Sequence, residues 1–346
     1  MIYSENIALQ TACLHIVGNK TLEEGVILSD SLMQIDKGIK PILNRFFVSS
    51  FKSDERYSLF HHSGLEFNFV YKVVSSIFED HESLYQSSVM LANHLYEQSN
   101  HNKIKGGEFC VAYFKELEID GVKTDAVGLF KSENKETYLR VVKNHGHNEL
   151  EQDAGININK LDKGCLVFNL NREEGYVVAI IDSVNRIEAK YWVEDFLQAK
   201  PRSDEYRYTY FMLSAAKSFI TKELPTDHEV TKGDQAELID KTLRYFQENE
   251  SFDIVDFSNK VIGDEQLSSE FGEYVDFFME KNNLERRDSF DISASAVKKT
   301  SRSMKSVIKL DKNFHIYVHG GDGLIKKGYD PETGMAFYQL YFKEEE

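Results

Sequence analysis

A basic segment near the end of the chain, residues 298–327, holds the side chains best suited to binding an anionic ligand. It reads KKTSRSMKSVIKLDKNFHIYVHGGDGLIKK. Eight cations and two acids give it a charge of +6, whereas the whole chain carries −16 and the remaining residues sum to −22. Lysines interspersed with histidine and tyrosine are typical of a surface that binds phosphate. The competing interpretation is a charged, solvated face without a ligand.

Ten side chains of this basic segment are candidate contacts to nucleic acid: its eight cations, one histidine and one tyrosine. Because the ionic screening length is about 8 Å at physiological salt, such a patch can act independently of an acidic remainder. The candidates are Lys298, Lys299, Arg302, Lys305, Lys309, Lys312, His315, Tyr317, Lys326 and Lys327.

Two features of the basic segment leave two interpretations open. Its residues 314–319 alternate between apolar and polar types, the pattern of a half-buried strand with His315, Tyr317 and His319 on one face. That face either stacks on nucleic acid or is the more solvated side of a small sheet. Likewise, the backbone amides of Gly320–Gly323 either surround a phosphate or simply connect two strands.

The chain contains no motif of a familiar catalytic site. P-loop, dinucleotide-binding, nucleophile-elbow and zinc-protease motifs are all absent from the sequence. His61-His62 and His145-Gly146-His147 lack a third ligand at a fixed spacing, so we predict no metal site. Cys13, Cys110 and Cys165 lie isolated among apolar neighbours, which is typical of reduced, inert thiols. We therefore predict no catalytic residue and no cofactor.

The first part of the chain has the pattern of an antiparallel sheet with packed helices. Extended segments are expected around Ile7–Val17 and Gly25–Leu28, and amphipathic helices at 67–78 and 84–95. Asp120-Gly121 predicts a two-residue hairpin turn. A meander of strands is expected around it, followed by one helix: Glu108–Leu117, Val122–Lys131, Glu136–Val142, Gly164–Leu170, Gly175–Asp182 and the helix Glu205–Glu223. Together they predict an α+β domain over residues 1–224.

A domain boundary is expected at Leu224–Asp234, which contains proline and glycine and has no apolar periodicity. Residues 235–346 are then expected to form a small domain of helices and a β-hairpin that includes the basic segment. Its expected elements are helices at Gln235–Gln247, Ile254–Val261 and Ser268–Lys281, strands at Phe314–Val318 and Ala336–Phe342, and a turn at Tyr329–Gly334. The third helix carries four carboxylates, which makes it a poor surface for phosphate.

The composition is that of an ordinary globular protein. Hydrophobic residues make up 41% of the chain and charged residues 28%, so we expect a folded core. The longest apolar runs, such as residues 177–181, span five residues, whereas a membrane-spanning helix needs roughly 20. The first residues lack the pattern of a signal peptide. We therefore expect a cytoplasmic protein that has no membrane partner.

Several segments together resemble the bacterial 37-kD nucleoid-associated protein family, also called NdpA-like. Near the N-terminus these are Asn6–Leu9 and Val26–Leu32. From residue 251 onwards they follow in order: Ser251–Lys260, the aromatic helix Phe271–Phe278, the Ser/Lys-rich run Ser295–Met304, the strand Phe314–Val318 and the turn Tyr329–Thr333. The resemblance covers nearly the full length, and its middle part is diverged.

The resemblance implies a cytoplasmic protein on the bacterial nucleoid that associates with DNA and has no established catalysis. The N-terminal domain would then serve assembly or partner binding, and the basic segment would approach DNA. Two alternatives stay open: an interaction scaffold that a nucleoid protein recruits, and an unrecognised enzyme that processes nucleic acid. Homo-oligomer formation is left open by the sequence.

Overall fold

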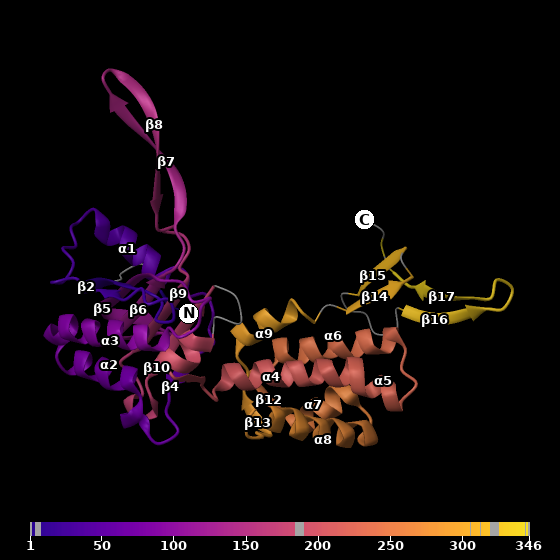
Figure 1. The fold of residues 1–346 in the computed structure, drawn as a ribbon. Coiled ribbons are helices and arrows are strands. Elements are labelled where there is room, and N and C mark those ends of the chain that lie inside the picture. The colour runs from indigo at the N-terminus through magenta and orange to yellow at the C-terminus, as the bar shows by residue number, and fades with distance from the viewer. Residues whose placement is uncertain are drawn as a thin grey trace. The chain divides into compact units, whose positions relative to one another are not determined.

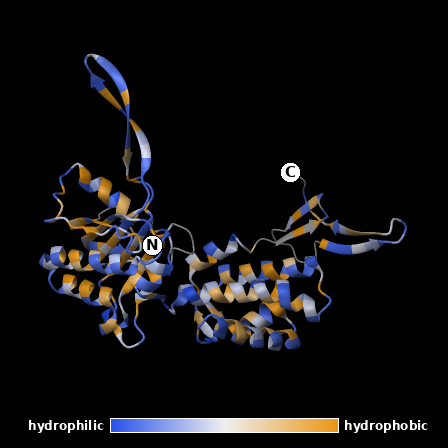
Figure 2. Ribbon diagram, viewed as in Figure 1, coloured by the Kyte–Doolittle hydropathy of each residue, from blue (hydrophilic) through white to orange (hydrophobic). Residues whose placement is uncertain are grey.

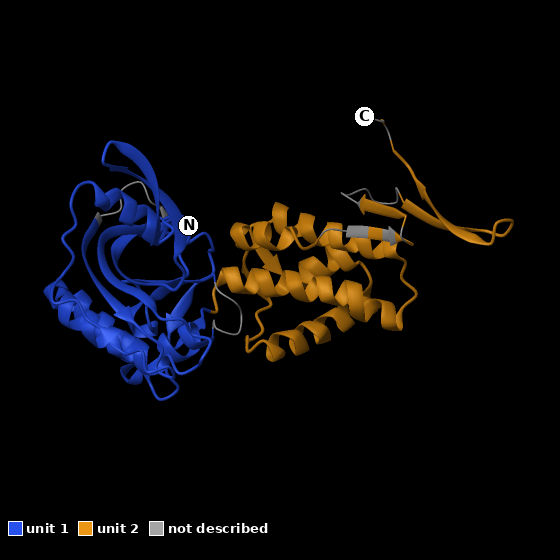
Figure 3. Cartoon of the chain, turned by 45° about the horizontal axis from the view of Figure 1, so that its top comes forward, with its two compact units in different colours: residues 1–202 blue, residues 203–346 orange. Residues whose placement is uncertain are grey.

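The computed structural model describes residues 2–3, 8–183, 190–304, 306–311, 313–318, 325–342 and 344. The chain divides into two compact units, Met1–Arg202 and Ser203–Glu346 (Figure 3). Each unit has its own hydrophobic core, so each is described separately. The fold is α+β, as the sequence predicted.

A nine-stranded sheet forms the centre of the first unit. The strand order is β11-β4-β10-β9-β6-β5-β2-β3, and β1 pairs with β5 outside this path. Every pairing is antiparallel. The strands are β1 Ile2–Tyr3, β2 Ala8–Val17, β3 Val26–Ile27, β4 Tyr57–Leu59, β5 Gly107–Ile119, β6 Val122–Ser132, β9 Lys163–Phe168, β10 Val177–Asp182 and β11 Ala199–Pro201.

Helices cover both faces of this sheet. On one face, α2 (Phe69–Glu79), α3 (Leu84–Gln98) and a short π-helix at Tyr191–Phe196 pack on alternate strand residues such as Val111. On the other face, α1 (Ile39–Val48) packs on the residues between them, such as Ala112. The period-two alternation of the strands therefore supplies two cores at once.

The hairpin at Asp120-Gly121 forms as predicted. Both residues have positive φ angles, 49° and 82°, as the tight turn between β5 and β6 requires. The meander does not continue into Glu136–Val142, however. That segment is β7 (Glu136–Asn144), which pairs with β8 (His147–Gly155) in a separate two-stranded sheet. Since almost every side chain of this hairpin is exposed, no buried face fixes it to the larger sheet.

The second unit is a helical body with two small hairpins. Its long helices are α4 (Glu205–Ser218), α6 (Lys232–Glu248) and α8 (Glu265–Lys281), which share one apolar core. Figure 2 shows hydrophobic and hydrophilic stripes along these helices. The shorter elements are π-helices at Phe219–Glu223 and Ser258–Ile262, helices α5 Leu224–Asp227, α7 Ile254–Phe257 and α9 Ala294–Ser301, and the strand pair β12 Ser251–Asp253 and β13 Ser289–Asp291.

The division between the units lies before the boundary expected at Leu224–Asp234. Helix α4 belongs to the second unit, where it contacts α6, α8 and α9. Pro225 stands in the first turn of α5, where the missing N–H costs nothing. Thr231 and Asp234 form a capping box that begins α6. Proline and glycine therefore mark helix ends inside the second unit.

The C-terminal strands form two hairpins. The predicted strand Phe314–Val318 is β15, but it pairs with β14 (Ser306–Leu310). The predicted final strand is β17 (Met335–Leu340), and it pairs with β16 (Ile325–Asp330). The turn between β16 and β17 forms as predicted: the carboxylate of Asp330 accepts hydrogen bonds from the amide of Glu332 and the hydroxyl of Thr333. Phe314 is 65% exposed, so the half-burial expected of it is wrong.

Candidate nucleic-acid interface

The candidates Lys298, Lys299 and Arg302 lie on and just after helix α9. The side chain of Ser293 accepts a hydrogen bond from the amide of Ala296 and so begins the helix. The helix buries Ala296, Val297 and Thr300, leaving the lysines exposed. Lys298 and Arg302 are four residues apart and therefore lie on the same side of the helix.

Lys299 differs from these neighbours because two tyrosine rings engage it. Its ammonium lies 5.5 Å from the ring centre of Tyr206 and 5.6 Å from that of Tyr210, both on α4. Such cation–π contacts hold the amine against the helical body. Lys299 therefore has a structural role as well as a candidate role in binding.

The β14–β15 hairpin presents polar residues on its outer face. Ile308 is buried, and β14 contacts α6, so this side of the hairpin faces the helical body. His315 and Tyr317 alternate with Ile316 and are exposed, Tyr317 by 58%. The strand register pairs Lys309 with His315. In the backbone of the hairpin, a lysine thus lies opposite a histidine.

The β16–β17 hairpin carries Lys326 and Lys327, both exposed. As neighbours on a strand they point to opposite faces, and the ammonium of Lys326 lies 5.5 Å from the ring centre of Tyr341. Burial and the nearby Asp234 carboxylate raise the pKa of Tyr338. Because Asp234 is in the first turn of α6, this hairpin lies next to the start of that helix.

Three of the ten candidates cannot be placed fully. Lys305, Lys312 and the loop Gly320–Gly323 lie outside the described residues, and for Lys309 only the backbone is described. His319 lies outside them as well. The described candidates therefore form two groups in the second unit, one at the end of α9 and one on the two hairpins.

The exposed cations of the basic segment differ from those of the helical body in their pairing. Among the described residues, no carboxylate forms an ion pair with Lys298, Arg302, Lys326 or Lys327. On the helical body, several cations are paired with nearby carboxylates: Lys241 with Glu237, Arg244 with Asp240, Lys260 with Asp256, and Arg286 with Asp276 and Asp288. Unpaired cations are the ones free to attract an anion from solution.

Charge also separates along the second unit. Residues 203–297 contain ten cations and twenty-one acids, a balance of −11, whereas residues 298–327 carry +6. In Figure 1, α9 and the two hairpins lie along one side of the helical body and the acidic helix α8 along the opposite side. An anionic ligand is therefore attracted to one side of this unit.

The fold explains the positions of His145 and of the three cysteines. His145 and Gly146 form the turn of the β7–β8 hairpin, with φ angles of 43° and 88°. No group of three or more metal-ligating side chains is found among the described residues. All three cysteines are buried, and burial raises the pKa of the Cys110 thiol and of the Cys165 thiol. A raised pKa leaves little thiolate for chemistry at neutral pH.

Two buried lysines in the first unit, Lys131 and Lys163, were not predicted from the sequence because they belong to no recognisable motif. The amine of Lys131 donates to the Lys105 carbonyl, to Glu133 and to the Tyr191 hydroxyl, at 2.7, 3.1 and 3.1 Å. The amine of Lys163 donates to both carboxylate oxygens of Asp182, at 3.0 and 2.9 Å. Burial lowers the pKa of Lys131. Since each fully buried amine has a carboxylate partner, we interpret the cluster as a structural link between β6, β9 and β10.

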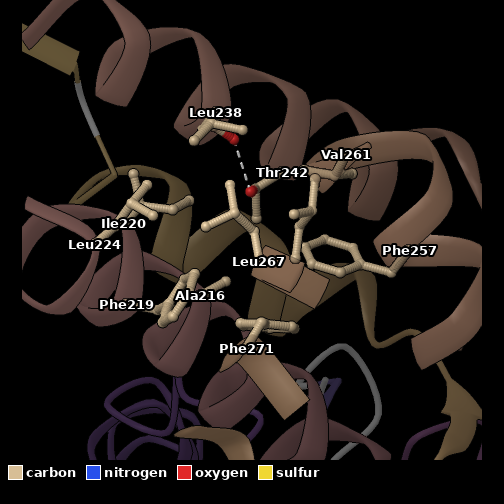
Figure 4. A pocket seen from close by; sticks show the side chains of 11 residues that line it. Ala216, Phe219, Ile220, Leu224, Leu238, Thr242, Phe257, Val261, Leu267 and Phe271 are labelled. Carbon is tan, nitrogen blue, oxygen red and sulfur yellow. Dashed lines mark hydrogen bonds between the residues drawn. The ribbon is translucent and has the colours of Figure 1, made fainter. Parts of the chain in front are cut away.

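A small pocket in the helical body is apolar throughout (Figure 4). Its walls include Phe219, Leu238 and Phe271, and it has room for roughly one water molecule. The hydroxyl of Thr242 donates to the Leu238 carbonyl at 2.7 Å and so offers nothing to a ligand. The pocket is a gap in the packing of the core and is too small for a cofactor.

The fold and the surface define an α+β protein that carries a basic segment on an otherwise acidic chain. The family model described as nucleoid-associated protein YejK matches residues 13–335, and the chain belongs to this family. The resemblance recognised in the sequence is thereby confirmed. No curated protein matches the chain. No helix among the described residues is long and apolar enough to cross a membrane.

Proposed function

We propose that the chain binds DNA directly, through the basic segment of its second unit, and catalyses no reaction. The observation that supports this most is the set of exposed cations without carboxylate partners in the described part of the unit: Lys298, Arg302, Lys326 and Lys327. Membership of a nucleoid-associated family agrees with it. The protein would then reside in the cytoplasm, on the nucleoid.

The binding should depend on phosphate rather than on base sequence. Lysine and arginine side chains on a helix end and on hairpin strands neutralise phosphates and release counterions. Four such contacts give a slope of about −4 in the logarithm of the binding constant against the logarithm of salt concentration. His315 and Tyr317 supply a ring and hydrogen-bonding groups beside them, which suits an exposed base.

A pair of matched charge reversals tests this proposal. Lys298→Glu/Arg302→Glu changes the net charge of the chain by the same amount as Lys222→Glu/Lys281→Glu, which alters two exposed lysines of the helical body. Fluorescence anisotropy with a labelled duplex should show a large loss for the first variant only, with a salt slope shallower by about 2. Equal losses would mean that net charge, not the basic segment, governs the binding.

A second candidate is a scaffold that reaches the nucleoid through a protein partner. The net charge of −16 and the balance of −11 over residues 203–297 favour it, because DNA repels such a surface. The two candidates differ in the purified protein. A scaffold would leave the duplex unbound even at low salt, and its Lys298→Glu/Arg302→Glu variant would remain on the nucleoid in cells.

A further inference from the structure

The β7–β8 hairpin is an arm that no other strand of the described chain supports. Its two strands pair only with each other over residues 136–155. Figure 1 shows the arm standing away from the sheet and helices of its unit. An isolated two-stranded hairpin is at best marginally stable in water, so an arm of this length calls for a partner surface.

The side chains of the arm are sorted between its two faces. The register pairs Leu139 with Gln152, Val141 with Leu150, and Thr137 with Ala154, so these six share one face. Leu139, Val141 and Leu150 are 66%, 67% and 66% exposed. We call this surface the apolar face of the arm; besides its apolar residues it holds Thr137 and Gln152 and, at the tip, Lys143 and Asn148.

Apart from Lys143 at the tip, the charged side chains of the arm lie on the opposite face, where most of them bind a cross-strand neighbour. The guanidinium of Arg140 is 2.8 Å from the Glu151 carboxylate, its cross-strand partner. The Tyr138 hydroxyl donates to Asp153 at 3.2 Å, and the Asn144 amide donates to Glu149 at 3.2 Å. This face therefore needs no further partner for its charges, and the apolar face is the one left to be covered.

The apolar surface continues beyond the arm at its base. Ile156 and Ile158, which follow β8, are exposed, as are Ile39 and Ile42 of α1. The Arg45 guanidinium of α1 donates to the Asn159 side chain at 3.0 Å and so places the helix against this segment. The exposed apolar surface therefore extends from the arm onto the sheet-and-helix body of the first unit.

We propose that the arm is a dimerisation element whose apolar face packs on the same face of a second copy. Nucleic acid does not suit this surface, because residues 136–155 carry two cations and four acids, a balance of −2. A second copy suits it because the only charged side chain on the apolar face is Lys143, at the tip. Face-to-face packing of two such arms therefore buries no like charges at its centre.

Antiparallel arms related by a two-fold axis satisfy this arrangement best. The rows Leu139–Gln152 and Val141–Leu150 would then face each other at the centre, and each Lys143 would lie at the base of the other arm, away from its own counterpart. A dimer would also join two basic segments in one particle. Two linked DNA-binding units bind a long duplex more tightly than one, although the dimer itself does not depend on DNA binding.

Sedimentation velocity of the full chain tests the proposal. The wild type should have twice the chain mass of 40.0 kDa, whereas Val141→Lys/Leu150→Lys should have the single mass at the same concentration. The matched control is Arg140→Gln/Glu151→Gln on the charged face, which should remain a dimer. Because the arm lies outside the three apolar cores, circular dichroism should show the lysine variant folded.

A chain without the arm tests the same proposal independently, in case the lysine variant misfolds. Replacing residues 137–154 with a two-residue turn should also give the single mass, with the fold kept. A wild type that sediments at the single mass, or a lysine variant or shortened chain that remains a dimer, overturns the proposal. A wild type of single mass whose apolar face binds a different protein would assign the arm to that partner instead.

Discussion

The imidazole Nε2 of His15 lies 2.9 Å from the hydroxyl of Ser88, and both side chains are buried between the sheet and helix α3. On the same helix, the ring of His94 contacts the carbonyl oxygen of Phe196 at 3.2 Å. Two histidines therefore help to dock α3 on the first unit. Burial lowers the pKa of each, so both rings are neutral in the folded state at neutral pH.

The first unit should lose stability in mild acid. A lowered folded-state pKa means that the unfolded chain binds the proton more tightly, so the free energy of unfolding should fall as the pH drops below about 6.5. Thermal melts between pH 8 and pH 5 measure this. His15→Gln should reduce the dependence on pH, while His62→Gln, which changes an exposed ring, should keep that of the wild type. Parallel curves for all three proteins would contradict the argument.

The three cysteines should be inert in the folded protein. Cys13, Cys110 and Cys165 are buried, and burial raises the pKa of each thiol. A thiol reagent at pH 8 should therefore react slowly with the native chain and at the ordinary rate once denaturant unfolds it. One rapidly modified residue in the native protein would show that its thiol is accessible.

A fragment that ends at Arg202 should fold alone, whereas one that ends at Leu224 should be less soluble. The first contains the whole nine-stranded sheet and both of its cores. The second adds α4, whose apolar residues Met212, Leu213 and Ala216 pack in the core of the other unit. Exposing that stripe should cause aggregation and binding of a hydrophobic dye. A well-behaved longer fragment with no excess dye binding would place α4 in the first unit.

Asp253 should contribute to stability as a helix cap. It precedes α7, and its carboxylate accepts hydrogen bonds from the amides of Val255 and Asp256, at 3.0 and 2.9 Å. Asp253→Ala should cost about 1 kcal/mol of unfolding free energy, whereas Asp253→Asn keeps an acceptor and should cost less. Denaturant melts of the full chain, or of the second unit, compare the two. DNA affinity should be unchanged in both variants.

The segment Ser251–Lys260, which carries part of the family resemblance, contains residues that stabilise the helical body. Phe252 and Phe257 are buried in the helical core. Phe252 stacks on Phe290 across the β12–β13 pair, with ring centres 4.9 Å apart. Lys260 pairs with Asp256 one helical turn earlier. A segment that helps to identify the family can thus owe its pattern to the packing of the core.

Local features of the sequence were sufficient where neighbouring residues decide the structure. Asp120-Gly121 adopts the positive φ angles of a tight hairpin. The helical spacing of Phe271, Tyr274, Val275 and Phe278 marks the side of α8 that packs on the core. The basic character of residues 298–327 is likewise a property of composition. The family followed from the order of short segments, none of which depends on distant contacts.

Only the tertiary structure decided which segments belong together. The pattern of α4 predicts a helix with one apolar side, but not that this side packs on α6 and α8 rather than on the sheet before it. The strand β15 alternates correctly, yet its partner is β14 and not the final strand. The alternation in β7 suits a meander, but the segment is part of a free arm with an uncovered apolar face. Each choice depends on surfaces contributed by residues far apart in the chain, and a one-dimensional pattern shows that a face is apolar without showing what covers it.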